Sequence, residues 1–242
     1  MAGESRLDMG VHLTLTSEWA GYRWGPISTR TKHAVCLTRK AISGIAEGVQ
    51  AHLQPAMALA ECAAQIRQVQ RAGIDITHLD THMGAAIIPA LVEHYVHLGF
   101  QYQVPVLLPR RIDDYVRALG LTSPDEQPWL DFTAAVEAQG MPLVDWFRIT
   151  PGYHLEGEKG DRAELYETLL HELPAGVTYF SLHPNASGDI EMIVPDRAYW
   201  RTFEYEYFQS TRLRDFLVQE GIVPIGYRAI RDIMRRANQQ YP

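Results

Sequence analysis

The chain has 242 residues, of which 46% are hydrophobic, enough to bury the core of one sizeable globular domain. Its 29 acidic residues outnumber 22 basic ones, the formal net charge is −7, and no run of Lys or Arg interrupts the mixture. This charge distribution argues against a nucleic-acid-binding surface, because contacts to phosphates need clustered positive charge.

Cysteine usage and hydropathy indicate the compartment. Only Cys36 and Cys62 are present, and their spacing fits neither a CxxC motif nor a disulfide framework, so we expect free thiols in a reducing environment. The opening residues lack the pattern of a signal peptide, and no apolar run approaches the roughly 18 residues of a membrane span. The sequence therefore predicts a cytoplasmic protein with no membrane partner.

In the first half of the chain, strand patterns alternate with helical ones. The pattern predicts a strand over 11–16 and then a helix over 55–73, with Pro55 in the first turn and Gly73 as its stop. Further elements follow in the order strand, helix, strand, and the helix is expected to close at Gly99. These three elements cover residues 74–80, 87–99 and 102–109.

The second half continues this alternation of strand and helix. Strands are expected over 142–150, 176–184 and 222–228, helices over 161–173 and 211–221, and an exposed loop over 122–130. Such a rhythm favours parallel strands joined by crossover helices, as a barrel or as an open doubly wound sheet. No GxGxxG or P-loop motif follows a strand, which argues against nucleotide chemistry. We treat residues 1–242 as a single α/β domain.

Three histidines fall within or just beyond predicted strands, at His12, His78 and His183. The carboxyl ends of parallel strands converge on one face, where sites are built. For His183, which precedes Pro184, a site residue and a residue of a capping loop are equally consistent with the spacing.

The segment THLDTH places His78, Asp80 and His82 at alternate positions. In an extended strand the backbones of the two histidines would lie about 13 Å apart, too far for both to bind one ion comfortably. Either the chain turns after Asp80, or only one of these histidines is a ligand. Alone, His78 is better explained as a hydrogen-bonded core or surface residue, whereas His12 with His82 forms an imidazole pair that suits a divalent transition metal.

These motifs resemble the YdjC-like carbohydrate deacetylases, also called the ChbG/HpnK family. The family's first histidine motif is similar to GVHLTLT from Gly10, its second to THLDTH from Thr77, and a later His-Pro to LHP at His183. The three motifs occur in the family's order, and IGYRAIRD near the C-terminus extends the resemblance over almost the whole chain.

The resemblance implies an irregular (β/α) barrel that hydrolyses the acetamide of an N-acetylated sugar or short oligosaccharide with the help of a divalent metal ion, Mg or Zn. By position, His12 and His82 would be the metal ligands and His183 a general acid. Asp80 would support the metal site or take part in catalysis, and His78 would orient its neighbours. A bound ion would polarise the amide and activate water, and a protonated imidazole would then release the sugar amine.

One departure from the family concerns its opening strand, which carries an Asp-Asp-Phe-Gly motif with a metal-binding aspartate and its neighbouring base. That motif is absent here; Asp113-Asp114 is followed by Tyr115 in a helix-like context and does not replace it. We therefore expect a barrel without its first strand and helix, about 30 residues, and an incomplete metal site. The strand edges left unpaired would favour association into a homo-oligomer.

Two functions from different classes follow. The first is a deacetylase. The second is a non-catalytic remnant or sugar-binding scaffold whose groove is lined by Trp19, Tyr22 and Trp24. Aromatic rings in such a segment could stack on sugar faces, or could simply cover the core.

Overall fold

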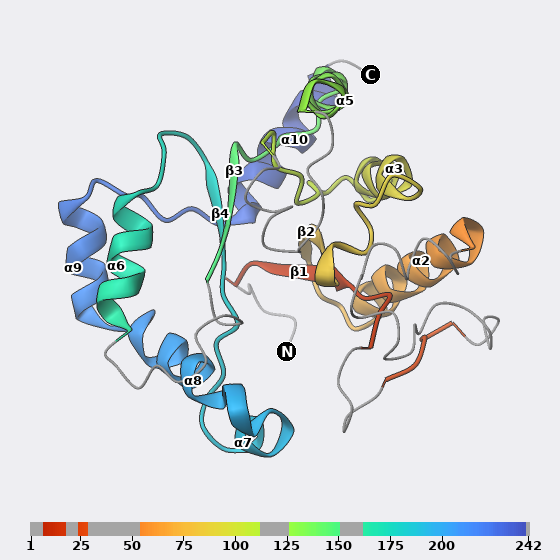
Figure 1. Ribbon diagram of the computed structural model, residues 1–242. Coiled ribbons are helices and arrows are strands. Elements are labelled where there is room, and N and C mark those ends of the chain that lie inside the picture. The colour runs from red at the N-terminus through yellow and green to blue at the C-terminus, as the bar shows by residue number, and fades with distance from the viewer. Residues whose placement is uncertain (1–6, 18–23, 29–53, 112–125, 151–161, 241–242) are drawn as a thin grey trace. The chain divides into compact units, whose positions relative to one another are not determined.

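The computed structural model describes residues 7–17, 24–28, 54–111, 126–150 and 162–240 (Figure 1). They fall into two compact units. The first comprises Met1–Val144 with Gly226–Pro242, and the second comprises Asp145–Ile225. Each unit has its own pair of parallel strands and its own helices.

The strands of the first unit are β1 (Met9–Leu13) and β2 (Ile76–Thr81), which pair in parallel. Single parallel bridges continue the arrangement, from Leu79 to Val106 and from Pro109 to Val144. The strand predicted over 102–109 is thus reduced to isolated bridges. Pro105 and Pro109 explain the reduction, because proline has no N–H to donate to a ladder.

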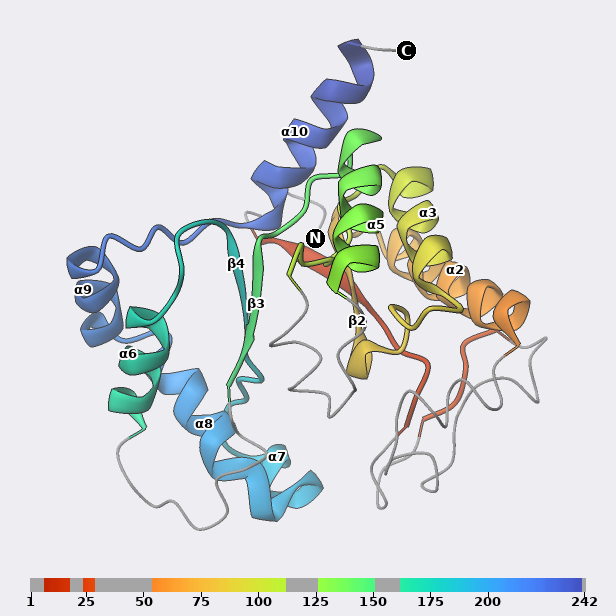
Figure 2. The ribbon, with the colours of Figure 1, turned by 45° about the horizontal axis from the view of Figure 1, so that its top comes forward.

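Among the described residues, four long helices belong to the first unit, and α2 lies against β1 while α10 lies against β2 (Figures 1 and 2). Helix α2 begins at Pro55 as predicted, and Gly73 follows it with a φ of 76°. The prediction of a loop over 122–130 is wrong from residue 126 onward, where α5 begins. The bounds are α2 (Pro55–Arg71), α3 (Val92–Tyr102), α5 (Glu126–Ala138) and α10 (Tyr227–Gln240).

Helix α3 does not end at Gly99. It continues to Tyr102 and is closed by Gln103, which adopts a left-handed φ of 53°. A Cβ at Gly99 would lie 2.6 Å from Val106 Cγ1 and 2.9 Å from the Val104 carbonyl oxygen. Glycine is therefore required here by close packing rather than by helix termination.

The substitution Gly99→Ala should destabilise the protein by about 1–3 kcal/mol, because overpacking a close contact costs more than the gain of about 0.5–1 kcal/mol in helix propensity. Denaturant unfolding measures the difference. Gly25→Ala is the control, since a Cβ there meets nothing within 4 Å. Equal stability of Gly99→Ala and the parent would contradict the packing argument.

The second unit contains β3 (Trp146–Ile149) and β4 (Thr178–Ser181), which pair in parallel, with α6 (Ala163–His171) between them in the chain. The helical segments that follow are α7 (Asp189–Ile193), η3 (Pro195–Arg197), α8 (Ala198–Tyr207) and α9 (Thr211–Gln219). The strand predicted over 222–228 is wrong: residues 222–226 have no regular structure, and α10 begins at Tyr227.

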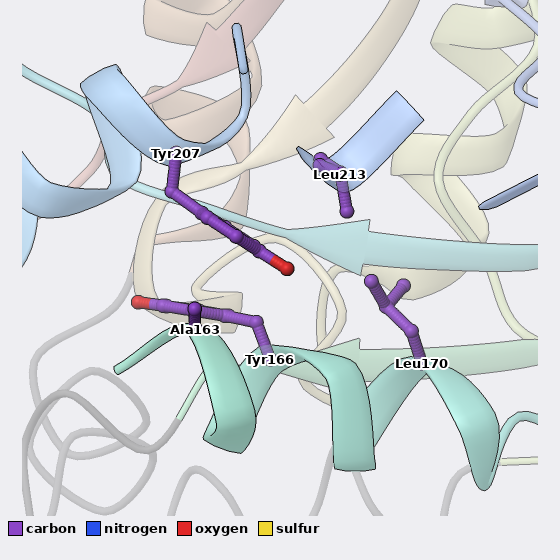
Figure 3. Close-up of a cluster of buried hydrophobic side chains, with 5 residues drawn as sticks. All are labelled: Ala163, Tyr166, Leu170, Tyr207 and Leu213. Atoms are coloured by element: carbon purple, nitrogen blue, oxygen red, sulfur yellow. The ribbon is translucent and has the colours of Figure 1, made fainter. Parts of the chain in front are cut away.

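The core of the second unit is aromatic (Figure 3). Tyr166 and Leu170 of α6 point toward Tyr207 of α8 and Leu213 of α9, and all four are buried. The rings of Tyr166 and Tyr207 stack with centroids 5.7 Å apart. Burial of such rings stabilises each helix more than its intrinsic propensity does.

The predicted class, α/β with parallel strands, is confirmed. Within the described residues, however, the strands form two separate two-stranded sheets and do not close into a barrel. The irregular barrel therefore stays a prediction.

Candidate functional site

The site in the first unit starts from the register of β1 and β2. His12 lies opposite Asp80 on the neighbouring strand, and Leu13 lies opposite Thr81. Because side chains alternate along a strand, Val11 and Leu13 enter the core while His12 faces outward, with 55% of its side chain exposed. His12 and Asp80 therefore meet on one face of the pair, near its carboxyl end.

His82 reaches the same place because the chain turns. Strand β2 ends at Thr81, and a short 3-10 helix, η2 (His82–Gly84), follows, with Met83 in the left-handed region at a φ of 52°. The hydroxyl of Thr81 accepts the N–H of Ala86 and secures the turn. The sequence left open a turn after Asp80 or a single ligand among His78 and His82. The structure has a turn, after Thr81, but it brings His82 to His12 and leaves the ring of His78 stacked on Tyr227.

The turn brings His82 Nδ1 to 3.2 Å from His12 Nε2. On its other side, His12 Nδ1 lies 2.8 Å from an oxygen of Asp80. With Nδ1–H donated to the carboxylate, Nε2 of His12 keeps a lone pair that faces His82. Two nitrogens that each bind one ion at about 2.1 Å are separated by about 3.0–3.4 Å, depending on the bond angle. The observed separation fits a shared ion.

Among the described residues, no group of three or more His, Cys, Asp or Glu side chains is arranged to hold a metal ion. The described part of the chain therefore offers the imidazole pair as the donors that could hold an ion.

His78 does not join this group. Its ring stacks on Tyr227 with centroids 4.1 Å apart, and its Nδ1 contacts the Thr77 hydroxyl. A Cβ at Gly10 would lie 2.4 Å from His78 Nε2, so glycine is needed where β1 passes this ring. Burial lowers the pKa of His78, more than the nearby Asp80 and Asp8 raise it. His78 is thus a neutral packing residue between β1, β2 and the start of α10.

A cavity of about 510 Å³ adjoins the histidine pair. His12 and His82 line it together with Trp24, whose ring approaches His82 edge to face with centroids 6.0 Å apart. The volume is in the range of small-molecule sites. Of the three aromatic residues predicted to contact a sugar, Trp24 lines the cavity, while Trp19 and Tyr22 lie outside the described residues.

His183 belongs to the second unit, two residues beyond β4, and its approach to His12 stays a prediction. Its backbone N–H donates to Glu204 Oε2 at 2.6 Å, and its ring meets Trp200 edge to face at 5.6 Å. Glu204 is fully buried on α8 and also accepts the hydroxyls of Thr150 and Tyr166 at 2.8 and 2.9 Å. Burial raises the pKa of Glu204 despite these donors.

Sequence reasoning missed Glu204 and a second buried carboxylate, Glu61. Glu61 could have been noticed, since it lies four residues before Gln65 on the predicted apolar face of a helix, where a polar pair needs a partner. Glu204 lies in the segment FEYEYF, where no periodicity distinguishes it from its exposed neighbour Glu206.

A match to the sequence model of a protein family shows which family the chain belongs to. The sequence model of the YdjC-like protein family matches residues 1–219. The chain belongs to this family. The resemblance drawn from its motifs is therefore confirmed.

One relative of this YdjC-like chain and one solved structure of similar fold add detail. A carbohydrate deacetylase of Thermus thermophilus is 29% identical over 231 residues, which cover 94% of this chain and 79% of the relative. A crystal structure from Enterococcus faecalis, of a protein described as a cellobiose-phosphate cleavage protein, matches with a TM-score of 0.67 and 19% identity, covering 93% of this chain and 78% of that one. This second likeness supports the fold alone. In the described parts of the chain, no helix is long and apolar enough to cross a membrane.

Proposed function

We propose that this protein is a carbohydrate deacetylase that removes the acetyl group of an N-acetylated sugar with the help of a divalent metal ion at His12 and His82. The observation that carries the proposal is the 3.2 Å separation of His12 Nε2 and His82 Nδ1, with Asp80 on the far nitrogen of His12. The deacetylase relative and the family membership support the reaction class.

Each residue of the site has a distinct task in this proposal. Asp80 holds His12 in the tautomer that offers Nε2, and it stabilises the positive charge that the ring gains on binding a cation. Imidazole ligands suit Zn²⁺ better than Mg²⁺, which prefers oxygen. When bound, the ion would polarise the acetamide carbonyl and lower the pKa of a water molecule.

Two further groups would act on the sugar. Trp24 forms part of the cavity wall beside His82 and offers an apolar surface to a sugar ring. His183, on the second unit, would protonate the amine that leaves as the amide bond breaks. The short hydrogen bond from its backbone to Glu204 holds the segment that carries it.

Acetate release from N-acetylated mono- and oligosaccharides tests the proposal. After chelation the protein should be inactive. It should recover activity on addition of Zn²⁺, because the ion would again polarise the acetamide carbonyl and activate the attacking water. Acetate assays with the chelated and reloaded protein measure this. The second candidate, a non-catalytic sugar-binding protein, rests on the position of Trp24 at the cavity. Sugar binding without acetate release at any metal concentration would establish that candidate and contradict the first.

A further inference from the structure

Residues 24–28, here called the Trp24–Ser28 strap, include four residues that line the cavity, Trp24 to Ile27. Hydrogen bonds hold the strap at both ends. The Trp24 N–H donates to the Ser17 hydroxyl at 3.2 Å. At the other end, the N–H groups of Ile27 and Ser28 donate to the two carboxylate oxygens of Glu61, each at 2.9 Å. A single side chain of α2 thus fixes the backbone of the strap.

Glu61 is only 2% exposed. Burial acts to raise its pKa, but hydrogen bonds from Gln65, Ile27 and Ser28 outweigh burial and bring the pKa below its ordinary value. A buried carboxylate is costly unless its oxygens are satisfied, and an apolar residue would pack the helix as well. Since both oxygens already accept hydrogen bonds, Glu61 is poorly suited to act as a base toward water.

Gln65, one turn further along α2, links the same network to β1. Its amide nitrogen donates to Glu61 Oε1 at 2.9 Å and to the Thr14 carbonyl at 2.8 Å. Its amide oxygen accepts the Thr14 N–H at 2.9 Å. Thr14 is two residues beyond His12, so one pair of side chains connects the strap with the strand that carries the candidate metal ligand.

We propose that Glu61, supported by Gln65, is a positioning residue for the substrate: it holds the Trp24–Ser28 strap so that Trp24 stands beside His82 where the sugar binds. The identity of the ligand rests on the proposed function. The role of Glu61 is to fix the wall of the cavity, and the imidazole pair does not depend on it. Its loss therefore affects the Michaelis constant for the sugar more than the affinity for metal.

The variant Glu61→Gln tests the proposal, because the amide keeps the size of the side chain but places an NH₂ group against a backbone N–H of the strap. We expect the amides of Ile27 and Ser28 to exchange hydrogen about tenfold faster or more, and KM for the sugar to rise by a similar factor. Zn²⁺ affinity and kcat should each stay within about threefold of the parent, since His12 and His82 keep their contacts.

Two further variants separate this role from a general loss of stability. Ser28→Pro removes one N–H donor of the strap and leaves α2 intact, so it should reproduce the rise in KM. Glu93→Gln makes the same charge change at an exposed position of α3 and should alter neither KM nor exchange at residues 27 and 28.

The outcomes are decisive in either direction. Unchanged exchange at Ile27 and Ser28 in Glu61→Gln, together with an unchanged KM in both Glu61→Gln and Ser28→Pro, would overturn the proposal. Faster exchange throughout α2 together with lost Zn²⁺ affinity would also overturn it, because Glu61 would then be a residue of the core. If the parent releases no acetate and binds no sugar, the proposed function has failed, and exchange at residues 27 and 28 still decides whether Glu61 holds the strap.

Discussion

Replacing His82 with alanine is expected to weaken Zn²⁺ binding by about 1000-fold or more and to abolish metal-dependent acetate release. The loss should exceed the roughly 10–100-fold that removing a hydrogen-bond partner of a metal ligand typically costs. The reason is the geometry of the pair: His12 Nε2 and His82 Nδ1 are 3.2 Å apart, and a single imidazole cannot hold the ion against water. Calorimetric titration of the metal-free protein measures the affinity.

Two companion variants sharpen this measurement. Asp80→Asn should keep the ion but weaken its binding by about 10–100-fold, since His12 loses the carboxylate that selects its tautomer. His94→Ala removes an exposed imidazole from α3 and should bind Zn²⁺ like the parent. Parent-like affinity in His82→Ala would remove this residue from the metal site.

The second large effect is expected at Glu204. Glu204→Ala should lower the free energy of unfolding by about 3 kcal/mol or more. The substitution removes the hydrogen-bond acceptor of the Thr150 and Tyr166 hydroxyls and of the His183 N–H. Denaturant unfolding followed by the aromatic signals of the second unit measures the loss.

Glu206→Ala, two residues away on the same helix and exposed, is the matched control and should change stability by no more than about 0.5 kcal/mol. The pH dependence supplies a second check. Burial raises the pKa of Glu204 in the folded state above its ordinary value of 4.5. At pH values between the pKa of the unfolded state and the raised pKa of the folded state, the folded state therefore binds more protons than the unfolded state. The parent should therefore lose stability relative to Glu204→Ala as pH rises through this window. A stability gap that widens with rising pH would contradict the raised pKa.

Particular elements show how far sequence patterns reach. Helix α2 begins and ends close to its predicted positions, because Pro55 and Gly73 act on the backbone locally. The strand predicted over 222–228 is wrong, since a short apolar run reads as a strand whether or not another strand is available to pair with it. The sequence predicts that Gly99 terminates a helix. In the structure Gly99 lies within α3, where the absence of a Cβ lets Val106 pack closely against the helix.

By itself, the sequence determined the α/β class and the membership of the YdjC-like family, because the alternation of elements, the turn residues and the spacing of motifs are properties of neighbouring residues. The role of His12, Asp80 and His82 as site residues stays a prediction from the same motifs. The sequence already favoured His12 and His82 as a pair, but only the tertiary structure decided the 3.2 Å contact between them and the stacking of His78 on Tyr227. The contact depends on the register of two strands 70 residues apart and on a left-handed turn at Met83. The roles of Glu61 and Glu204 likewise arise from partners distant in the chain, and a buried carboxylate reveals its function only through the donors that the fold brings to it.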